Sequence, residues 1–261
     1  MARSRLAGLA VGLLLAFLAA APVRGEVTQK NGLIVNFGGS ISPRSLPRAG
    51  TAPIGITVNA QVRTASGQLP PALRRISLQI NRNGVLDDRG LPTCRRDQLV
   101  PSSSQQAMAA CGRARVGGGR VTGRIALPEQ PPLAFQGRVI AFNGRHLAGG
   151  HAILAHIYTH SPFALSVVLT FTLERTPGTF GTRLVAVVPQ QIRRQLHITS
   201  FRLRLKRSYS RDGRRHSYLS AGCPAPAGFP GATFPLARAA YSFVGGTTLR
   251  SVIVRTCHAR G

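Results

Sequence analysis

Three of the chain's seven histidines lie in one stretch, HAILAHIYTH, at His151, His156 and His160. Imidazoles can bind a metal when they converge from one face of a helix or strand. The intervening β-branched and aromatic residues favour a strand, on which His156 and His160 would point one way and His151 the other. His156 and His160 would then lie about 13 Å apart, too far to share an ion. We therefore expect no metal site, but a strand with partly exposed histidines that adds a pH-sensitive charge to the surface.

Groups suited to hydrolysis are sparse. The chain contains neither G-x-S-x-G nor H-E-x-x-H, and it has only seven carboxylates. The adjacent pair Asp87 and Asp88 would diverge on a strand, whereas glycosidases need two carboxylates that face one cleft. We therefore predict no catalytic residue, no cofactor and no enzyme activity. A secreted hydrolase with a dispersed Ser–His–Asp triad stays open as the alternative, because triads assemble from distant positions.

Two other stretches resemble ligand-binding loops only superficially. INRNGVLDDRG, residues 80–90, lacks the acidic first ligand and the final glutamate of a calcium loop, so we interpret Asn83–Gly84 as a hairpin turn. VGGGR, residues 116–120, lacks the Lys-Ser/Thr of a phosphate-binding loop and is interpreted as a flexible turn.

Charge is the strongest compositional signal. The chain has 34 Lys and Arg against 7 Asp and Glu, a formal net charge of +27. Such a surface attracts anionic polymers, and salt weakens the attraction. The absence of Trp, the 6% aromatic content and the lack of a recognition motif argue against nucleic acid. We expect an anionic cell-wall polymer or lipid headgroups as the partner. The predicted anion-binding surface comprises Arg202, Arg204, Lys206, Arg211, Arg214 and Arg215.

The N-terminus and the cysteines indicate export. Residues 1–25 combine basic residues, a short apolar run and small residues, as in a cleaved secretory signal peptide. The run is too short for a membrane anchor. The four cysteines, Cys94, Cys111, Cys223 and Cys257, predict two disulfides in an exported chain. Three connectivities are open, and we favour the sequential pairs Cys94–Cys111 and Cys223–Cys257.

Strict apolar–polar alternation predicts an all-β protein built as an antiparallel β-sandwich. It is clearest in residues 53–64, 163–175 and 201–207, and turn residues separate the candidate strands. Only residues 103–110 are typical of a helix. A similar order of motifs in both halves favours two related lobes, residues 26–145 and 146–261, each with one disulfide. One large sandwich over residues 26–261 is the alternative.

Several motifs carry a resemblance to other proteins. SISPRSLPRAGTAPIGITV, GLPTC, RARVGGG, AFNGR, SYLSAGCPAPAGF and VRTC occur in this order between residues 40 and 257. In these motifs the chain resembles a group of exported proteins of high-GC actinobacteria that have no established activity. The resemblance implies secretion, an extracellular β-rich fold and paired cysteines, and it carries over no functional residue.

Together these observations predict a non-enzymatic protein, secreted or associated with the cell envelope, with a binding or structural role there. The charge on an exported chain is the basis of this prediction.

Overall fold

The computed structural model describes residues 25–145 and 150–260. The chain is mostly β, with 61% of residues in strands and 8% helical, which confirms the all-β prediction. The strands are β1 (Glu26–Lys30), β2 (Leu33–Ser42), β3 (Ser45–Pro47), β4 (Ala52–Pro53), β5 (Gly55–Thr64), β6 (Leu73–Asn81), β7 (Gly84–Leu86), β8 (Arg115–Ile125), β9 (Leu133–Arg145), β10 (His151–Thr159), β11 (Leu165–Arg175), β12 (Phe180–Val187), β13 (Leu196–Leu205), β14 (Ser208–Arg211), β15 (Arg214–Ser217), β16 (Leu219–Ala221), β17 (Gly231–Phe243) and β18 (Thr248–Arg260). The helices are α1 (Ser104–Cys111) and α2 (Gln190–Arg193), with 3-10 turns at Arg96–Gln98 and Gly112–Ala114.

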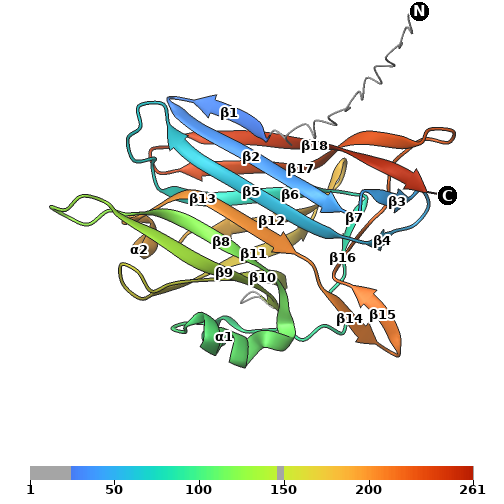
Figure 1. Ribbon diagram of the computed structural model, residues 1–261, viewed down its shortest axis with the longest axis horizontal. Coiled ribbons are helices and arrows are strands. Elements are labelled where there is room, and N and C mark those ends of the chain that lie inside the picture. Colours follow the sequence, from blue (N-terminus) through green and yellow to red (C-terminus); the bar gives the residue numbers. More distant parts are fainter. Residues whose placement is uncertain (1–24, 146–149, 261) are drawn as a thin grey trace, which may run out of the picture.

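One large sheet dominates the molecule. Its 13 strands follow the order β1-β2-β5-β13-β8-β9-β10-β11-β12-β6-β17-β18-β3, and every pair except β18–β3 is antiparallel. Figure 1 shows the sheet curling so that its two halves face each other, in the way that two layers face each other in a sandwich. Strands of both predicted lobes alternate in it, since β13 lies between β5 and β8. The division into lobes stays a prediction, and part of the proposed boundary (146–149) lies outside the described residues.

Side chains link the two ends of the curled sheet. Thr28 on β1 donates a hydrogen bond to the backbone carbonyl of Arg250 on β18 (3.1 Å), and its hydroxyl lies 2.8 Å from the hydroxyl of Ser251. Further along, Arg255 Nε donates to the carbonyl of Gly39 on β2 (2.7 Å). These bonds cover strand edges that would otherwise be free to pair with another chain.

Two apolar clusters form the core. The larger lies inside the curled sheet and contains inward-facing residues of most strands, including Phe37 and Tyr241, whose rings meet edge to face. The smaller lies between α1 and the outer face of β9, β10 and β11, where Leu99 and Ala107 pack against Leu154. Part of the outer face of these three strands is therefore covered, whereas Arg138 on β9 and the arginines on the outer face of β8 and β13 are exposed.

Local sequence signals account for α1 and for the disulfides. Ser103 caps the helix by accepting the backbone N–H of Gln106, and the Gln106 side chain accepts the Ser103 N–H in return. Both predicted disulfides are confirmed, Cys94–Cys111 and Cys223–Cys257, with Cα–Cα distances of 5.5 and 5.8 Å. Within residues 25–145 and 150–260, no helix has the length and apolar character that a membrane span requires.

Two loop interpretations are wrong. VGGGR is no flexible turn but lies in β8, in the middle of the large sheet. A Cβ on Gly117 or Gly119 would meet the backbone carbonyl of Arg204 or Arg202 on β13, so close strand approach explains these glycines. Asn83–Gly84 forms no hairpin, because β7 pairs with β16 while β6 stays in the large sheet.

Candidate functional site: a basic groove

The alternation of β13 creates two chemically different faces. Phe201, Leu203 and Leu205 point to the core, while Arg202 and Arg204 are exposed on the outer face. This follows from the two-residue period of a strand, which separates every second side chain onto the opposite face. The predicted basic strand face therefore exists, and Lys206 extends it just beyond the end of β13.

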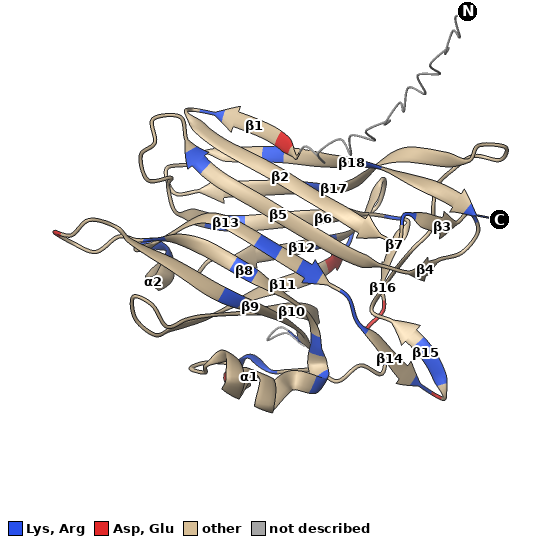
Figure 2. Cartoon of the chain, in the orientation of Figure 1, with Lys and Arg blue, Asp and Glu red and all other residues tan. Residues whose placement is uncertain are grey.

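Neighbouring strands add arginines to this face. Arg202 on β13 lies directly opposite Arg120 on β8, which in turn lies opposite Arg138 on β9. All three side chains are exposed. Figure 2 shows the basic bands crossing these adjacent strands. Like charges at directly opposed positions destabilise a sheet. Such an arginine row raises the local positive potential at a cost to the fold.

A groove adjoins this row, and we call it the basic groove. Gly118 lies between Arg204 on β13 and Ile140 on β9, so the outer face carries no side chain at its centre. The resulting cavity has a volume of about 520 Å³. Its lining consists of Gly117, Gly118 and Gly119, the apolar residues Val116, Val139 and Ile140, and the cations Arg115, Arg138, Arg204, Lys206 and Arg207.

Two cations of the groove, Arg115 and Arg207, contact backbone carbonyls rather than carboxylates. Arg115 Nε donates to the carbonyl of Gly117 (3.3 Å), and Arg207 Nη2 donates to that of Arg113 (3.5 Å). Arg207 Nε is buried and makes no hydrogen bond with any described residue. The described residues that line the groove include no Asp or Glu. The arrangement can bind an anion by charge and by guanidinium hydrogen bonds.

The second predicted group of cations lies elsewhere, on the β14–β15 hairpin. Arg211 is held by the protein itself: Nη1 donates to the carbonyl of Arg89 (3.0 Å), and Nε lies 3.6 Å from the Asp212 carboxylate. Arg214 and Arg215 are exposed. Neither belongs to the lining of the groove, so the structure separates the six predicted residues into a strand face and a hairpin.

Sequence reasoning missed four groove and row residues: Arg115, Arg120, Arg138 and Arg207. Arg120 and Arg138 do occupy outward positions of their strands, which alternation could have indicated. Their alignment with Arg202, however, depends on the pairing of strands that are distant in sequence. No local pattern encodes that register.

Three carboxylates lie in one segment, residues 87–97, which we call the acidic segment. Asp87 accepts from Arg89 Nε (2.9 Å), Nη2 (3.1 Å) and backbone N–H (3.1 Å). The Arg89 hydrogen bonds lower the pKa of Asp87. Asp97 accepts from Arg95 in the same bidentate way, which lowers the pKa of Asp97. Two of the three carboxylates are therefore neutralised by arginines of the segment itself.

The three histidines separate, as the spacing predicted, but their surroundings differ from the prediction. His151 is exposed and its Nδ1 lies 2.6 Å from the Asp88 carboxylate, a partner 63 residues away that the sequence did not indicate. His156 is fully buried, so the prediction of partly exposed histidines is wrong for it. The cause is the segment before α1, which covers the outer face of β10. His160, just beyond β10, is exposed like His151, as the pattern suggested.

Burial determines the chemistry of His156. Desolvation lowers its pKa, and a hydrogen bond between Nε2 and the carbonyl of Ser102 (3.0 Å) opposes the shift. The hydroxyls of Ser102 and Ser166 both lie 3.3 Å from Nε2. His156 Nδ1 is buried and has no hydrogen-bond partner among the described residues. Among the described residues, the hydrogen-bond partners of His156 are serines rather than a carboxylate, and the ring is buried, unlike the histidine of a hydrolytic triad. In the described part of the chain, no three His, Cys, Asp or Glu side chains gather as metal ligands would.

Comparison of the chain with protein-family models, with curated proteins and with solved structures finds no match. The resemblance to exported actinobacterial proteins therefore stays a prediction, and the site must be interpreted from its own geometry.

Proposed function

We propose that the protein is exported and binds an anionic polymer of the cell envelope in the basic groove, without catalysing a reaction. One observation carries the proposal: five cations surround a glycine-floored groove of about 520 Å³ whose described lining holds no carboxylate. Anionic partners bind where cations are concentrated and not already neutralised. A phosphate-rich polymer supplies repeated anions that guanidinium groups bind with two parallel hydrogen bonds.

The arginine row strengthens this interpretation. Placing Arg120 between Arg138 and Arg202 costs stability, since like charges lie opposite each other. An anion that bridges the row and the groove removes this repulsion. The placement of the arginine row beside the groove therefore favours an extended anionic ligand over a single small ion.

Export is the second part of the proposal. It rests on the signal-like residues 1–25, most of which lie outside the described residues, and on two disulfides. Disulfides persist in oxidising compartments outside the cytoplasm. In such a compartment of a cell with a wall, anionic polymers and lipid headgroups are the abundant polyanions.

The direct test measures binding of poly(glycerol phosphate) to residues 26–261 as a function of salt. We expect binding at low salt that weakens by at least about tenfold as the salt concentration rises, because dissolved ions screen the attraction between the cations of the groove and the phosphates. The variant Arg204→Ser with Lys206→Ser should weaken low-salt binding by about tenfold, the loss of two charge-assisted contacts. A matched variant, Arg63→Ser with Arg250→Ser, removes the same charge from exposed positions outside the groove.

The control pair should change affinity by less than about threefold, since only the net charge differs. Equal losses in both variants would mean that net charge alone attracts the polymer, and the groove would not be the site. No binding at low salt would refute the proposal. Binding to phosphatidylglycerol vesicles but not to the polymer would assign the groove to lipid headgroups instead.

A further inference from the structure

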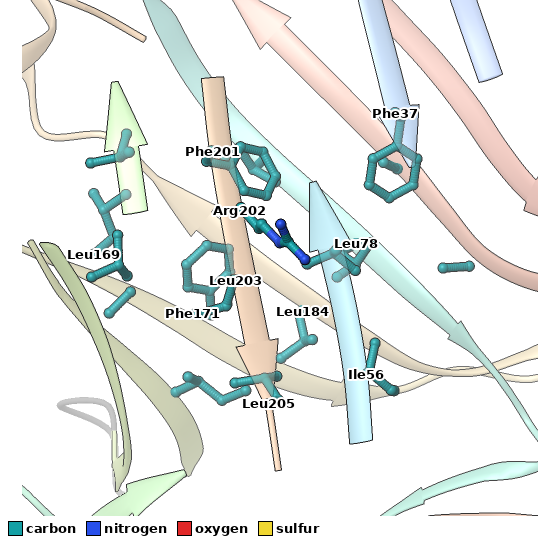
Figure 3. Close-up of a pocket in the computed structure, with 18 of the residues that line it drawn as sticks. Phe37, Ile56, Leu78, Leu169, Phe171, Leu184, Phe201, Arg202, Leu203 and Leu205 are labelled. Carbon is teal, nitrogen blue, oxygen red and sulfur yellow. The ribbon is translucent and has the colours of Figure 1, made fainter. Parts of the chain in front are cut away.

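The inside of the curled sheet contains a second cavity, on the opposite face of the strands from the basic groove. Its volume is about 130 Å³, and nearly every atom that faces it is apolar. Figure 3 shows members of the lining, which come from several strands: Phe37, Leu78, Phe171 and Leu184. The two cavities share only Val139 among their described lining residues, so each can be altered without the other.

The lining offers no partner to an ionised ligand. Its described residues include no Lys, His, Asp or Glu. Its two arginines, Arg120 and Arg202, are exposed and belong to the arginine row of the outer face. The inward positions next to them along β8 and β13 hold Val121 and Leu203. A charged group inside the cavity would therefore lose its water without gaining a partner, whereas a neutral hydrocarbon loses little.

The volume sets the size of the ligand. Protein interiors are packed like organic crystals, and voids larger than a water molecule are few. An engineered cavity of about 150 Å³ with an apolar lining stays dry and binds benzene. The cavity inside the curled sheet is comparable in volume and in lining, so it suits a neutral hydrocarbon of about the size of benzene.

The seam between β1 and β18 differs from the junctions within the sheet. In the part of the chain that the structure describes, these two strands are not neighbours in the sheet order and share no backbone ladder. Side chains join them instead. Thr28 contacts the hydroxyl of Ser251, and the Glu26 carboxylate accepts the backbone N–H of Val252. Opening this seam therefore breaks a few side-chain hydrogen bonds and no ladder.

The seam lies next to the cavity. Ser251 and Ile253 occupy the same face of β18, two residues apart, and both are buried. Ile253 lines the cavity, and Phe37 lines it from β2, the strand that pairs with β1. The hydroxyl pair of Thr28 and Ser251 is thus made on the inward side of β18, beside the apolar space.

We propose that the interior cavity is a binding site for a neutral hydrocarbon of about the size of benzene, which enters through the seam between β1 and β18. The site is independent of the basic groove, and neither proposal depends on the other.

The first test is calorimetric titration of residues 26–261 with benzene and with benzoate, in salt that screens attraction of benzoate to the basic surface. Benzene should bind, and benzoate should bind at least about tenfold more weakly, because its carboxylate finds no partner in the lining. Absence of benzene binding, or equal affinity for the two ligands, would overturn the proposal.

A pair of leucine variants locates the site. Leu169 lines the cavity, whereas Leu99 is buried in the smaller core. Leu169→Ala adds the volume of the removed side chain to the existing cavity, so naphthalene should bind at least about tenfold more tightly than to the wild-type chain. Leu99→Ala creates an isolated void that is too small for naphthalene, and its naphthalene affinity should stay within about twofold of the wild-type value. The same gain in both variants would place the ligand outside the cavity.

The entrance is tested by the rate of benzene exchange, measured by NMR. Thr28→Ala with Ser251→Ala should raise this rate by at least about fivefold, the increase in the open population that the loss of one hydrogen bond produces, and leave the affinity within about twofold. Thr233→Ala with Thr256→Ala is the matched control, because it removes an exposed hydroxyl pair between the laddered strands β17 and β18. Equal exchange rates in the two variants would refute the entrance at the seam.

Discussion

The acidic segment and the basic groove treat charge in opposite ways. In the acidic segment Asp87, Asp88 and Asp97 each have a cationic or imidazole partner at 2.6–3.0 Å. In the groove Arg115 and Arg207 donate to backbone carbonyls, and no carboxylate belongs to the described lining. Both regions belong to a chain with only seven acidic residues.

This difference indicates which of the two regions has positive charge left to bind an external anion. Three of the few carboxylates are used to fix a loop beside α1, where they hold arginines and His151 in place. The groove receives none of them, although its strands could have carried acidic residues at outward positions. Its positive charge is therefore a property that the fold maintains rather than cancels, and this is what a polyanion would recognise.

The disulfide at the acidic segment gives the largest expected effect. Cys94→Ala with Cys111→Ala should lower the free energy of unfolding by about 3 kcal/mol. The disulfide joins residues 17 apart, and a disulfide that closes a loop of about this length stabilises a protein by that amount. Chemical denaturation with urea measures the change. Polymer affinity of the folded variant should stay within about twofold, since the groove lies on β8, β9 and β13.

Addition of a reductant to the wild-type chain provides a control. The reductant also opens Cys223–Cys257, so the free energy of unfolding should fall by at least as much as in the cysteine variant. A large loss of polymer affinity at unchanged folding would contradict the separation of the two regions.

His156 predicts an acid sensitivity that belongs to the α1 side of the molecule. Its pKa is lower in the folded than in the unfolded chain, so the unfolded state binds the proton first. Stability should be complete above about pH 6.5 and fall as the pH decreases below it, by at most about 1.4 kcal/mol per pH unit. Unfolding titrations between pH 7.5 and 5 measure the slope.

His156→Gln should flatten this slope, whereas His151→Gln, at an exposed position, should retain it. A slope that survives in His156→Gln would show that another group causes it. The loss of stability that follows protonation of Asp87 and Asp97 occurs in a different pH range, because their lowered pKa values delay protonation to more acidic pH.

The arginine row gives the smallest effect, and its sign is unusual. Arg120→Thr should raise stability by about 0.2–1 kcal/mol at low salt, because it removes repulsion from Arg138 and Arg202. The gain should shrink in high salt. In the acidic segment Arg89→Gln should act in the opposite direction, since Asp87 loses its partner. Thermal unfolding at two salt concentrations compares them, and destabilisation by both variants would show that the row is compensated within the chain.

Local patterns explain why much of the fold was predictable. Residues 53–64 and 201–207 alternate because one face of each strand meets the core, and the alternation survives in β5 and in β13 with its extension to Lys206. Ser103 and Gln106 indicate the start of α1, because the capping box of a helix joins side chains and backbone N–H groups of residues three apart. The favoured sequential pairing of the cysteines is confirmed: the turn Arg96–Gln98 and α1 connect Cys94 to Cys111, and β17 and β18 connect Cys223 to Cys257.

The errors occurred where distant segments decide the outcome. Gly117 and Gly119 are interpreted from the sequence as a flexible turn because glycine is common in turns. In the structure β13 approaches so closely that a Cβ at either position would meet its backbone. His156 looked half exposed because a strand in isolation has an open face, and the segment around Ser102 covers that face.

The sequence by itself determined the β character of the chain, the position of α1, the excess of positive charge and the presence of arginines on one face of β13. Each of these depends on residue types or on spacings of two to four residues, which the chain carries locally. Only the tertiary structure decided that Arg138, Arg120 and Arg202 form one row and that Asp88 meets His151. It also decided that a glycine floor opens a groove. These depend on the register between strands that are far apart in sequence, which is set by the packing of the whole curled sheet rather than by any single segment.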